Sequence, residues 1–321
     1  MEHLRSEEDI IETCEVTILF SDLHGFTAMS ENYPAKFIIE SLNRYFSTMS
    51  EIIVTQHGGT IDKFMGDAIM AIFGIPESRT DDVERALSCA IHMQIAMSAI
   101  NQQNESFGMP HFYMGIGINS GNVVLGKVGS MLHSEYTVIG NEVNLASRIE
   151  TYSLRGQVLI SENTYQRAKD YIETSNATQV SVKGKIHPVN IYELLATKRP
   201  TLLTVPRREV RKSPRIDVDM PFTYQRVVEK YVLPEEYGGQ IMNISYDGLL
   251  INITEPLEVF SEIKFALAFP VAGNQTSDIY AKILRVQERE DYYLASIEFT
   301  SIHIHAKTAI KMFINRIIQG L

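Results

Sequence analysis

The sequence predicts an α+β protein with two domains: a mixed sheet with flanking helices, followed by a six-stranded β-barrel with a C-terminal helix. Three observations support this prediction. A chain of 321 residues is long enough for two domains. Helix-like and strand-like segments are mixed in the first part, whereas alternating, β-branched segments fill the second. Between these parts, residues 198–206 contain two prolines and little periodicity, so we expect a linker there, joining domains at 1–197 and 207–321.

The first elements follow from apolar periodicity. Residues 16–20 form a β-rich apolar run and are expected to be a buried strand. In residues 34–56, apolar side chains recur at helical spacing, which predicts a long helix. Residues 60–63 and 69–73 are typical of two short strands that meet at a turn around Gly66-Asp67. This part of the chain is therefore expected to be a strand, a helix and a hairpin with an acidic residue at its tip.

The rest of the first domain is expected to contain two helices and a second hairpin. Residues 79–100 are amphipathic, which predicts a helix. Residues 112–119 and 123–128 are strand-like and flank Ser-Gly-Asn at 120–122, so we expect a hairpin that turns there. Residues 141–152 are expected to be helical.

Six alternating, β-branched segments predict the barrel of the second domain. They are residues 222–228, 240–244, 248–253, 262–269, 279–286 and 292–299. Residues 302–318 then have the apolar spacing of an amphipathic helix that closes the domain.

Composition excludes several classes of protein. The net charge of −10 disfavours non-specific binding to nucleic acid. The longest apolar runs are far shorter than the ~20 residues of a membrane span, and the acidic first 15 residues do not resemble a signal peptide. Cys14 and Cys89 are too few and too far apart for a disulfide framework or a zinc site. We therefore expect a cytoplasmic protein with no membrane span and no nucleic-acid partner.

Two acidic residues stand at predicted strand ends. Asp22 follows the first buried strand in FSDLHGFT (20–27), and Asp67 lies at the hairpin turn in KFMGD (63–67). Carboxylates on adjacent strand ends can hold two divalent cations against a triphosphate. A single Gly-Asp pair, however, is far more often just a turn.

A third motif makes the pattern specific. With YTVIGNEVNLASR at 136–148, the two acidic motifs resemble those of class III nucleotide cyclases, in that family's order, over roughly residues 13–195. The resemblance implies that Asp22, Asp67 and the backbone carbonyl of Leu23 bind two metal ions, Mg²⁺ or Mn²⁺. It also implies that Asn144 orients the ribose and that Arg148, one helical turn later, stabilises charge on the α-phosphate.

Base selection is implied to depend on Lys63 and Thr137, the purine-reading positions of the family. A lysine that donates to adenine N1 favours ATP over GTP. Tyr113 stands where many members carry a triphosphate-binding arginine, and Lys183 or Lys185 is a substitute cation. In this family the metal ligands come from one subunit and the purine, ribose and transition-state residues from the other, so the resemblance implies a homodimer.

The second domain carries two further motifs. RKSPR at 211–215 and NISYDG at 243–248 resemble the two signatures of PilZ domains, over roughly residues 205–319. The resemblance implies a cyclic di-GMP site in which Arg211 and Arg215 bind the ligand's phosphates and stack on its guanine. Asn243 and Ser245 would bind base and phosphate, and Gly248 would allow close backbone approach. Two other interpretations are an Arg-x-x-x-Arg register that begins at residue 207 and a solvated basic linker.

Together, the motifs predict a homodimeric adenylate cyclase, with ATP as substrate, regulated by cyclic di-GMP. A guanylate cyclase is the alternative enzyme. A catalytically silent cyclase-like domain that dimerises a cyclic di-GMP receptor is the alternative from another class. A diguanylate cyclase would need Gly-Gly-Asp/Glu-Glu-Phe, which MGDAI at 65–69 does not supply.

Overall fold

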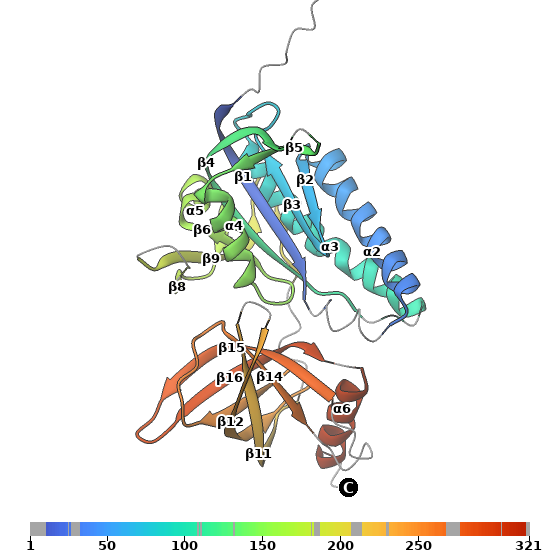
Figure 1. Cartoon of the computed structure of the whole chain (residues 1–321), viewed down its shortest axis with the longest axis vertical. Helices are drawn as coiled ribbons and strands as arrows, with labels where there is room; N and C mark the ends of the chain where they lie inside the picture. Colours follow the sequence, from blue (N-terminus) through green and yellow to red (C-terminus); the bar gives the residue numbers. More distant parts are fainter. Residues whose placement is uncertain are drawn as a thin grey trace, which may run out of the picture. The chain divides into compact units, whose positions relative to one another are not determined.

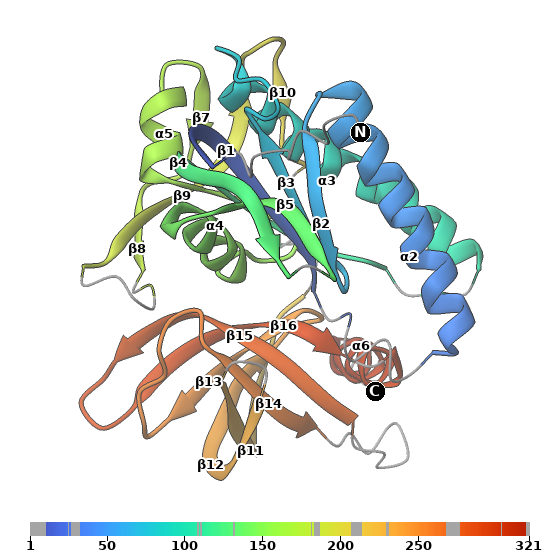
Figure 2. The same ribbon diagram turned by 45° about the horizontal axis from the view of Figure 1, so that its top comes forward.

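The computed structural model describes residues 11–24, 26, 33–107, 109, 111–130, 132–180, 182, 187–206, 214–228, 231–267, 277–302 and 304–318. The chain divides into two compact units, one from residues 1–23 and 39–207 and the other from 24–38 and 208–321. Figures 1 and 2 together label the helices and strands of both units. The predicted α+β fold class is confirmed: a mixed sheet with helices in the first unit, and a barrel with a C-terminal helix in the second.

A ten-stranded sheet forms the first unit. Its path is β10-β9-β6-β4-β1-β3-β2, with β5 beside β4 and with β7 and β8 beside β9. Strands β4 and β6 run parallel, and the other pairs along the path are antiparallel. The strands are β1 (Glu12–Leu23), β2 (Thr60–Met65), β3 (Ala68–Phe73), β4 (Met114–Gly129), β5 (Ser134–Ile139), β6 (Val158–Ser161), β7 (Ile172–Thr174), β8 (Thr178–Val180), β9 (Val189–Thr197) and β10 (Leu203–Thr204).

The helices cover both faces of this sheet. They are α2 (Ala35–Ser50), which continues as the π-helix η1 (Glu51–Gln56), α3 (Asp82–Ser106), α4 (Asn141–Thr151) and α5 (Glu162–Ala168). Val16 and Ile18 of β1 pack with Ala146 of α4 in one buried cluster. Thr17 and Leu19, which alternate with them, are equally buried. The central strand is therefore buried on both faces, as the sequence predicts.

The predicted second hairpin is wrong. Residues 114–129 form one strand, β4, which pairs with β1 without interruption through the expected turn. Ser120 and Gly121 are small because other parts of the chain pack closely against them, and they form no turn. A Cβ on Gly121 would meet Glu142 of α4 at 2.8 Å, and Ser120 Oγ lies 2.9 Å from the hydroxyl of Thr17. Glycine in a strand interior often marks a place where another part of the chain approaches closely.

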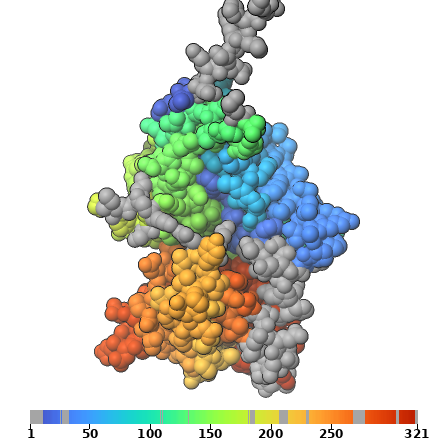
Figure 3. Space-filling view, viewed as in Figure 1, coloured from blue at the N-terminus to red at the C-terminus, as the bar shows by residue number. Residues whose placement is uncertain are grey.

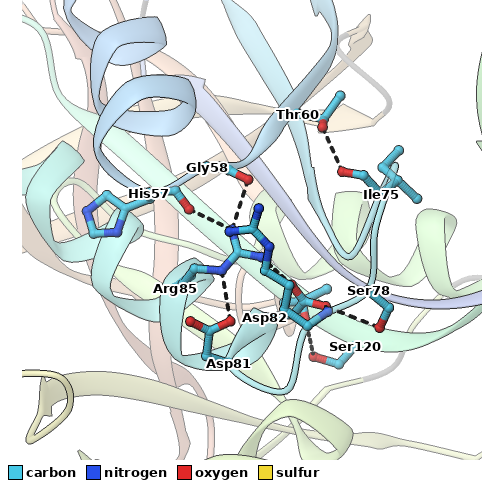
Figure 4. Close-up of polar contacts among 11 residues, drawn as sticks. His57, Gly58, Thr60, Ile75, Ser78, Asp81, Asp82, Arg85 and Ser120 are labelled. Carbon is cyan, nitrogen blue, oxygen red and sulfur yellow. Dashed lines mark hydrogen bonds and ion pairs between the residues drawn. The ribbon is translucent and has the colours of Figure 1, made fainter.

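Arg85 of α3 fixes the chain just before β2. Its Nη1 donates to the carbonyls of His57 at 2.7 Å and Gly58 at 2.8 Å, while its other nitrogens pair with Asp81 and Asp82 (Figure 4). These charge-assisted bonds join the end of η1 to the start of α3. They hold the strand that carries Lys63.

The second unit is a closed barrel of order β11-β12-β13-β16-β15-β14. Its elements are β11 (Ile216–Val228), β12 (Tyr231–Ile244), β13 (Gly248–Ile253), β14 (Glu262–Leu267), β15 (Ser277–Glu288), β16 (Tyr293–Ile302) and α6 (Ile304–Ile318). Alternate residues of the strands fill the interior, and Ile310 and Ile314 of α6 belong to the same buried cluster. Within the segment expected to be a linker, β10 pairs with β9 of the first unit.

Candidate functional site

Asp22 and Asp67 lie at the same edge of the sheet. Strands β1 and β3 pair as far as Ser21 and Ile69, so the next residue of β1, Asp22, approaches the turn between β2 and β3 that carries Asp67. Gly66 in this turn has φ +66°, a left-handed conformation that glycine adopts without strain. Both carboxylates are half-buried. The hairpin turn therefore brings an acid that is distant in sequence next to the end of β1.

Tyr45 of α2 lies within electrostatic reach of both carboxylates. Its ring is fully buried, and its hydroxyl donates to Met114 Sδ at 3.3 Å. Burial is the main cause that raises the pKa of Tyr45, and the negative charges of Asp22, Asp67 and Glu150 raise it further. The phenol therefore stays neutral close to the two acids. No sequence motif had connected any residue of α2 with Asp22 and Asp67.

The donor set at this edge fits a hard divalent cation. Asp22, Asp67 and the carbonyl of Leu23 offer oxygen atoms only, the ligands that Mg²⁺ and Mn²⁺ prefer. Within the described residues, no group of three or more His, Cys, Asp and Glu side chains is arranged to hold a metal. A cation here would therefore share its coordination between two carboxylates and the phosphates of a nucleotide, which is the usual mode for Mg²⁺ in nucleotide enzymes.

Asn144 and Arg148 project from one face of α4. They are one helical turn apart, and the side chain of Asn144 is exposed while that of Arg148 is half-buried. The opposite face of α4 is pressed against β4, because a Cβ on Gly117 would lie only 2.2 Å from the backbone nitrogen of Glu150. The helix is thus held firmly while its polar pair faces away from the core.

Lys63 and Thr137 come together although they belong to different strands. β5 lies beside the edge strand β2 (Figure 2), and the surfaces of these two segments adjoin (Figure 3). Thr137 Oγ1 donates to Asp62 Oδ1 at 2.8 Å and Oδ2 at 2.9 Å. Lys63 Nζ donates to Glu135 Oε2 at 2.8 Å and lies 3.6 Å from Asp62. A cluster of two acids, an ammonium and a hydroxyl results.

The charges in this cluster support one another. The hydrogen bond to Glu135 is the main cause that raises the pKa of Lys63, and the charge of Asp62 adds to it. The same hydrogen bond lowers the pKa of Glu135. Lys63 is therefore a cationic donor at neutral pH. Sequence reasoning missed Asp62 and Glu135, because no motif singles them out and strand alternation would place Asp62 on the face opposite Lys63.

Three of the expected residues, Lys183, Lys185 and Arg211, lie outside the described part of the chain. At Tyr113, where the family resemblance had pointed to a missing cation, the guanidinium carbon of Arg155 lies 4.8 Å from the centre of the ring. The backbone of Gly156, the next residue, donates to the carbonyl of Met114 at 2.9 Å. Arg155 is thus a cation near the start of β4 that no sequence motif indicated.

Arg215, the last residue of the first motif in the second unit, lies near the second motif. Arg215 is exposed and immediately precedes β11, whose first residue pairs with Ile244 of β12. The register therefore brings Arg215 to the end of β12, next to Asn243 and Ser245. Ser245 donates from both its backbone nitrogen and its Oγ to the carbonyl of Gly248, each at 2.9 Å.

Gly248 is required by packing. A Cβ there would lie 2.2 Å from the carbonyl oxygen of Ile297 in the neighbouring strand β16. The turn at residues 245–248 can therefore approach β16 only with glycine at this position.

None of the described helices is both long enough and apolar enough to cross a membrane.

Comparison with known families gives two matches. The family model of the adenylate and guanylate cyclase catalytic domain matches residues 9–196, and that of the PilZ domain matches residues 209–316. Among curated proteins, the chain is 32% identical over 187 residues to adenylate cyclase 1 of Rhizobium meliloti (strain 1021), which covers 58% of this chain and 28% of that protein. It is 39% identical over 193 residues to an adenylate cyclase of Anabaena cylindrica, which covers 57% of this chain and 37% of the relative. The matches thus span only about a third of these relatives' length.

Solved structures resemble the first unit. The guanylyl cyclase Cya2 matches with a TM-score of 0.59 and 42% identity, over 60% of this chain and 98% of that one. The adenylyl cyclase CyaB from P. aeruginosa matches with a TM-score of 0.57 and 39% identity, over 59% of this chain and 98% of that one. One similar structure is thus named for each of the two purine nucleotides.

Proposed function

Because the chain belongs to the family with an adenylate and guanylate cyclase catalytic domain, here followed by a PilZ domain, we propose that it converts ATP to 3′,5′-cyclic AMP and pyrophosphate. We place the cyclase domain at residues 1–197, the linker at 198–206 and the PilZ domain at 207–321. The observation that carries the choice of ATP is the cluster in which Lys63 and Thr137 meet. A cationic donor suits N1 of adenine, which is an acceptor, and does not suit the N1–H of guanine.

Divalent metal ions, which class III cyclases use, would be held by the carboxylates of Asp22 and Asp67 with the carbonyl of Leu23. We propose two ions, Mg²⁺ or Mn²⁺. They would lower the pKa of the ribose 3′-hydroxyl and neutralise the negative charge of the leaving pyrophosphate. The half-buried position of both acids supports this role, because a cation is attracted more strongly by carboxylates that are partly removed from water.

The remaining catalytic work belongs to side chains of the protein. Asn144 orients the ribose, and the guanidinium of Arg148 stabilises negative charge that develops on the α-phosphate. Lys183 or Lys185 contacts the outer phosphates. We propose that these residues and the purine-reading pair act on a nucleotide bound to the acids of a second copy of the chain, so that the active form is a homodimer with two shared sites.

The test is product identification with both nucleotides. Purified protein should form cyclic AMP from ATP at least roughly tenfold more efficiently than cyclic GMP from GTP, compared as kcat/KM. A preference for GTP would favour the guanylate cyclase alternative. No product from either nucleotide, with Mg²⁺ or with Mn²⁺, would favour the silent dimerisation module.

For the second domain we propose binding of cyclic di-GMP, and a change in cyclase rate on binding. Arg211 and Arg215 would hold the phosphates and stack on guanine. Asn243 and Ser245 would bind base and phosphate, and Gly248 would allow close backbone approach. The support is the register that brings Arg215 to the end of β12. The size of the rate change is set by the ligand's differential affinity for the cyclase states.

Calorimetric titration tests this part. Arg215→Ala should lose binding, because a charge-assisted phosphate contact disappears. Lys264→Ala is the matched control, since Lys264 is engaged with Asp278 at 2.7 Å on another strand and should leave binding unchanged. Equal affinity in the wild type and Arg215→Ala would reject the assigned site.

A further inference from the structure

Asp62 connects the two residues that we propose read the purine. Its side chain is only 3% exposed. It accepts a hydrogen bond from the hydroxyl of Thr137 and lies 3.6 Å from the ammonium of Lys63. We propose that Asp62 is a positioning residue that selects adenine over guanine by holding Thr137 as a hydrogen-bond acceptor. This inference rests on the proposed function, because it concerns the base of the same nucleotide.

A β-bulge gives Asp62 this position. In a regular strand, neighbouring residues point to opposite faces. The register of β2 against β3 is interrupted between Ile61 and Lys63, so Asp62 has no paired residue on β3. Bulges re-aim side chains in this way. Glu135 and Thr137, two residues apart on β5, share a face, and Asp62 and Lys63 both reach that face.

The hydroxyl of Thr137 has a single proton, and it donates that proton in a hydrogen bond to Asp62. Thr137 Oγ1 lies within 2.9 Å of both carboxylate oxygens, so its proton points at the carboxylate whichever oxygen it faces. Only the lone pairs of Oγ1 remain for another partner. Thr137 is 9% exposed and Asp62 is buried, so water does not replace this bond readily.

The resulting pattern is complementary to adenine. Adenine presents a donor at its exocyclic amine and an acceptor at N1, and the cluster presents an acceptor on Thr137 and a donor on Lys63. Guanine reverses both, with an acceptor at O6 and a donor at N1. To serve O6, Thr137 would have to turn its proton away from Asp62, leaving a buried carboxylate without its hydrogen bond, which is costly.

The neighbouring acid Glu135 provides a matched control. Its carboxylate also contacts Lys63, but it is exposed, and the contacts described for it involve Lys63 and His133 and not Thr137. Loss of charge near Lys63 is therefore common to Asp62→Asn and Glu135→Gln. Loss of the constraint on the Thr137 proton belongs to Asp62→Asn alone, because an amide nitrogen can donate to Oγ1 and free the hydroxyl to turn.

The experiment measures kcat/KM for ATP and for GTP in the full-length protein. Asp62→Asn should lower the ratio of the two values by roughly tenfold, whereas Glu135→Gln should leave it within about twofold of the wild type. Thr137→Ser, which keeps a hydroxyl, should retain the ratio, and Thr137→Val should lose it. In the Thr137→Val background, Asp62→Asn should cause no further loss, because Asp62 acts through that hydroxyl.

Several outcomes contradict the inference. An unchanged ratio in a folded Asp62→Asn protein, or a further fall when the change is added to Thr137→Val, would overturn the role of Asp62 while leaving adenylate cyclase activity intact. A wild type that prefers GTP would overturn the proposed activity and the acceptor role of Thr137 together. For any variant with slow turnover, dissociation constants for fluorescent analogues of ATP and GTP compare how tightly the two bases are bound.

Discussion

Asp67 is the residue on which the proposed chemistry most depends. It lies in the β2–β3 turn, half-buried, beside the end of β1. Asp67→Asn should reduce cyclic AMP formation to background with either Mg²⁺ or Mn²⁺, because it removes a charged cation ligand. The free energy of unfolding should change by less than about 1 kcal/mol, since the amide keeps the shape of the side chain.

The control for this prediction is Glu77→Gln. Glu77 is an exposed acid in the loop after β3, and its loss should leave the rate unchanged. Substantial cyclic AMP formation by a folded Asp67→Asn protein, measured by chromatography of the products, would exclude metal binding at this turn as the basis of catalysis.

At the scale of elements, the sequence predicts the first strand, the first hairpin and the barrel well, because each shows a clear apolar period. It fails at Ser120 and Gly121, which have turn chemistry but face Thr17 and Glu142. It also fails at Asp62, whose orientation depends on a bulge that leaves no local signal. In both cases a partner distant in the chain decides the structure.

The close packing of α4 against β4 leads to a prediction at the scale of elements. Gly117→Ala should destabilise the first unit by about 2 kcal/mol, because its Cβ would meet the backbone of α4 at 2.2 Å and the helix must move. The rate should fall as well, since α4 carries Asn144 and Arg148. Unfolding in urea measures the change in stability.

Gly238→Ala is the matched control, because a Cβ at Gly238 meets no atom within 4 Å and its strand, β12, belongs to the other unit. It should change stability by less than about 0.5 kcal/mol. Equal unfolding midpoints for Gly117→Ala and the wild type would show that α4 is not packed as tightly as described.

At the scale of the whole molecule, the proposed activity requires two copies of the chain. Each chain carries one acidic pair, Asp22 and Asp67, and one polar pair, Asn144 and Arg148, on separate elements. If the two pairs complete a site only across a dimer, variants that lack different pairs are complementary. One of the two sites in a mixed dimer then has both changes, and the other has neither.

The most direct test of this central claim is a mixing experiment with Asp22→Ala and Arg148→Ala. Each variant alone should form no cyclic AMP from ATP, and an equimolar mixture, after verified subunit exchange, should recover roughly a quarter of the wild-type rate, because half of the dimers are mixed and each has one intact site. A mixture that stays inactive, although exchange is demonstrated by labelled subunits, would contradict a shared catalytic site.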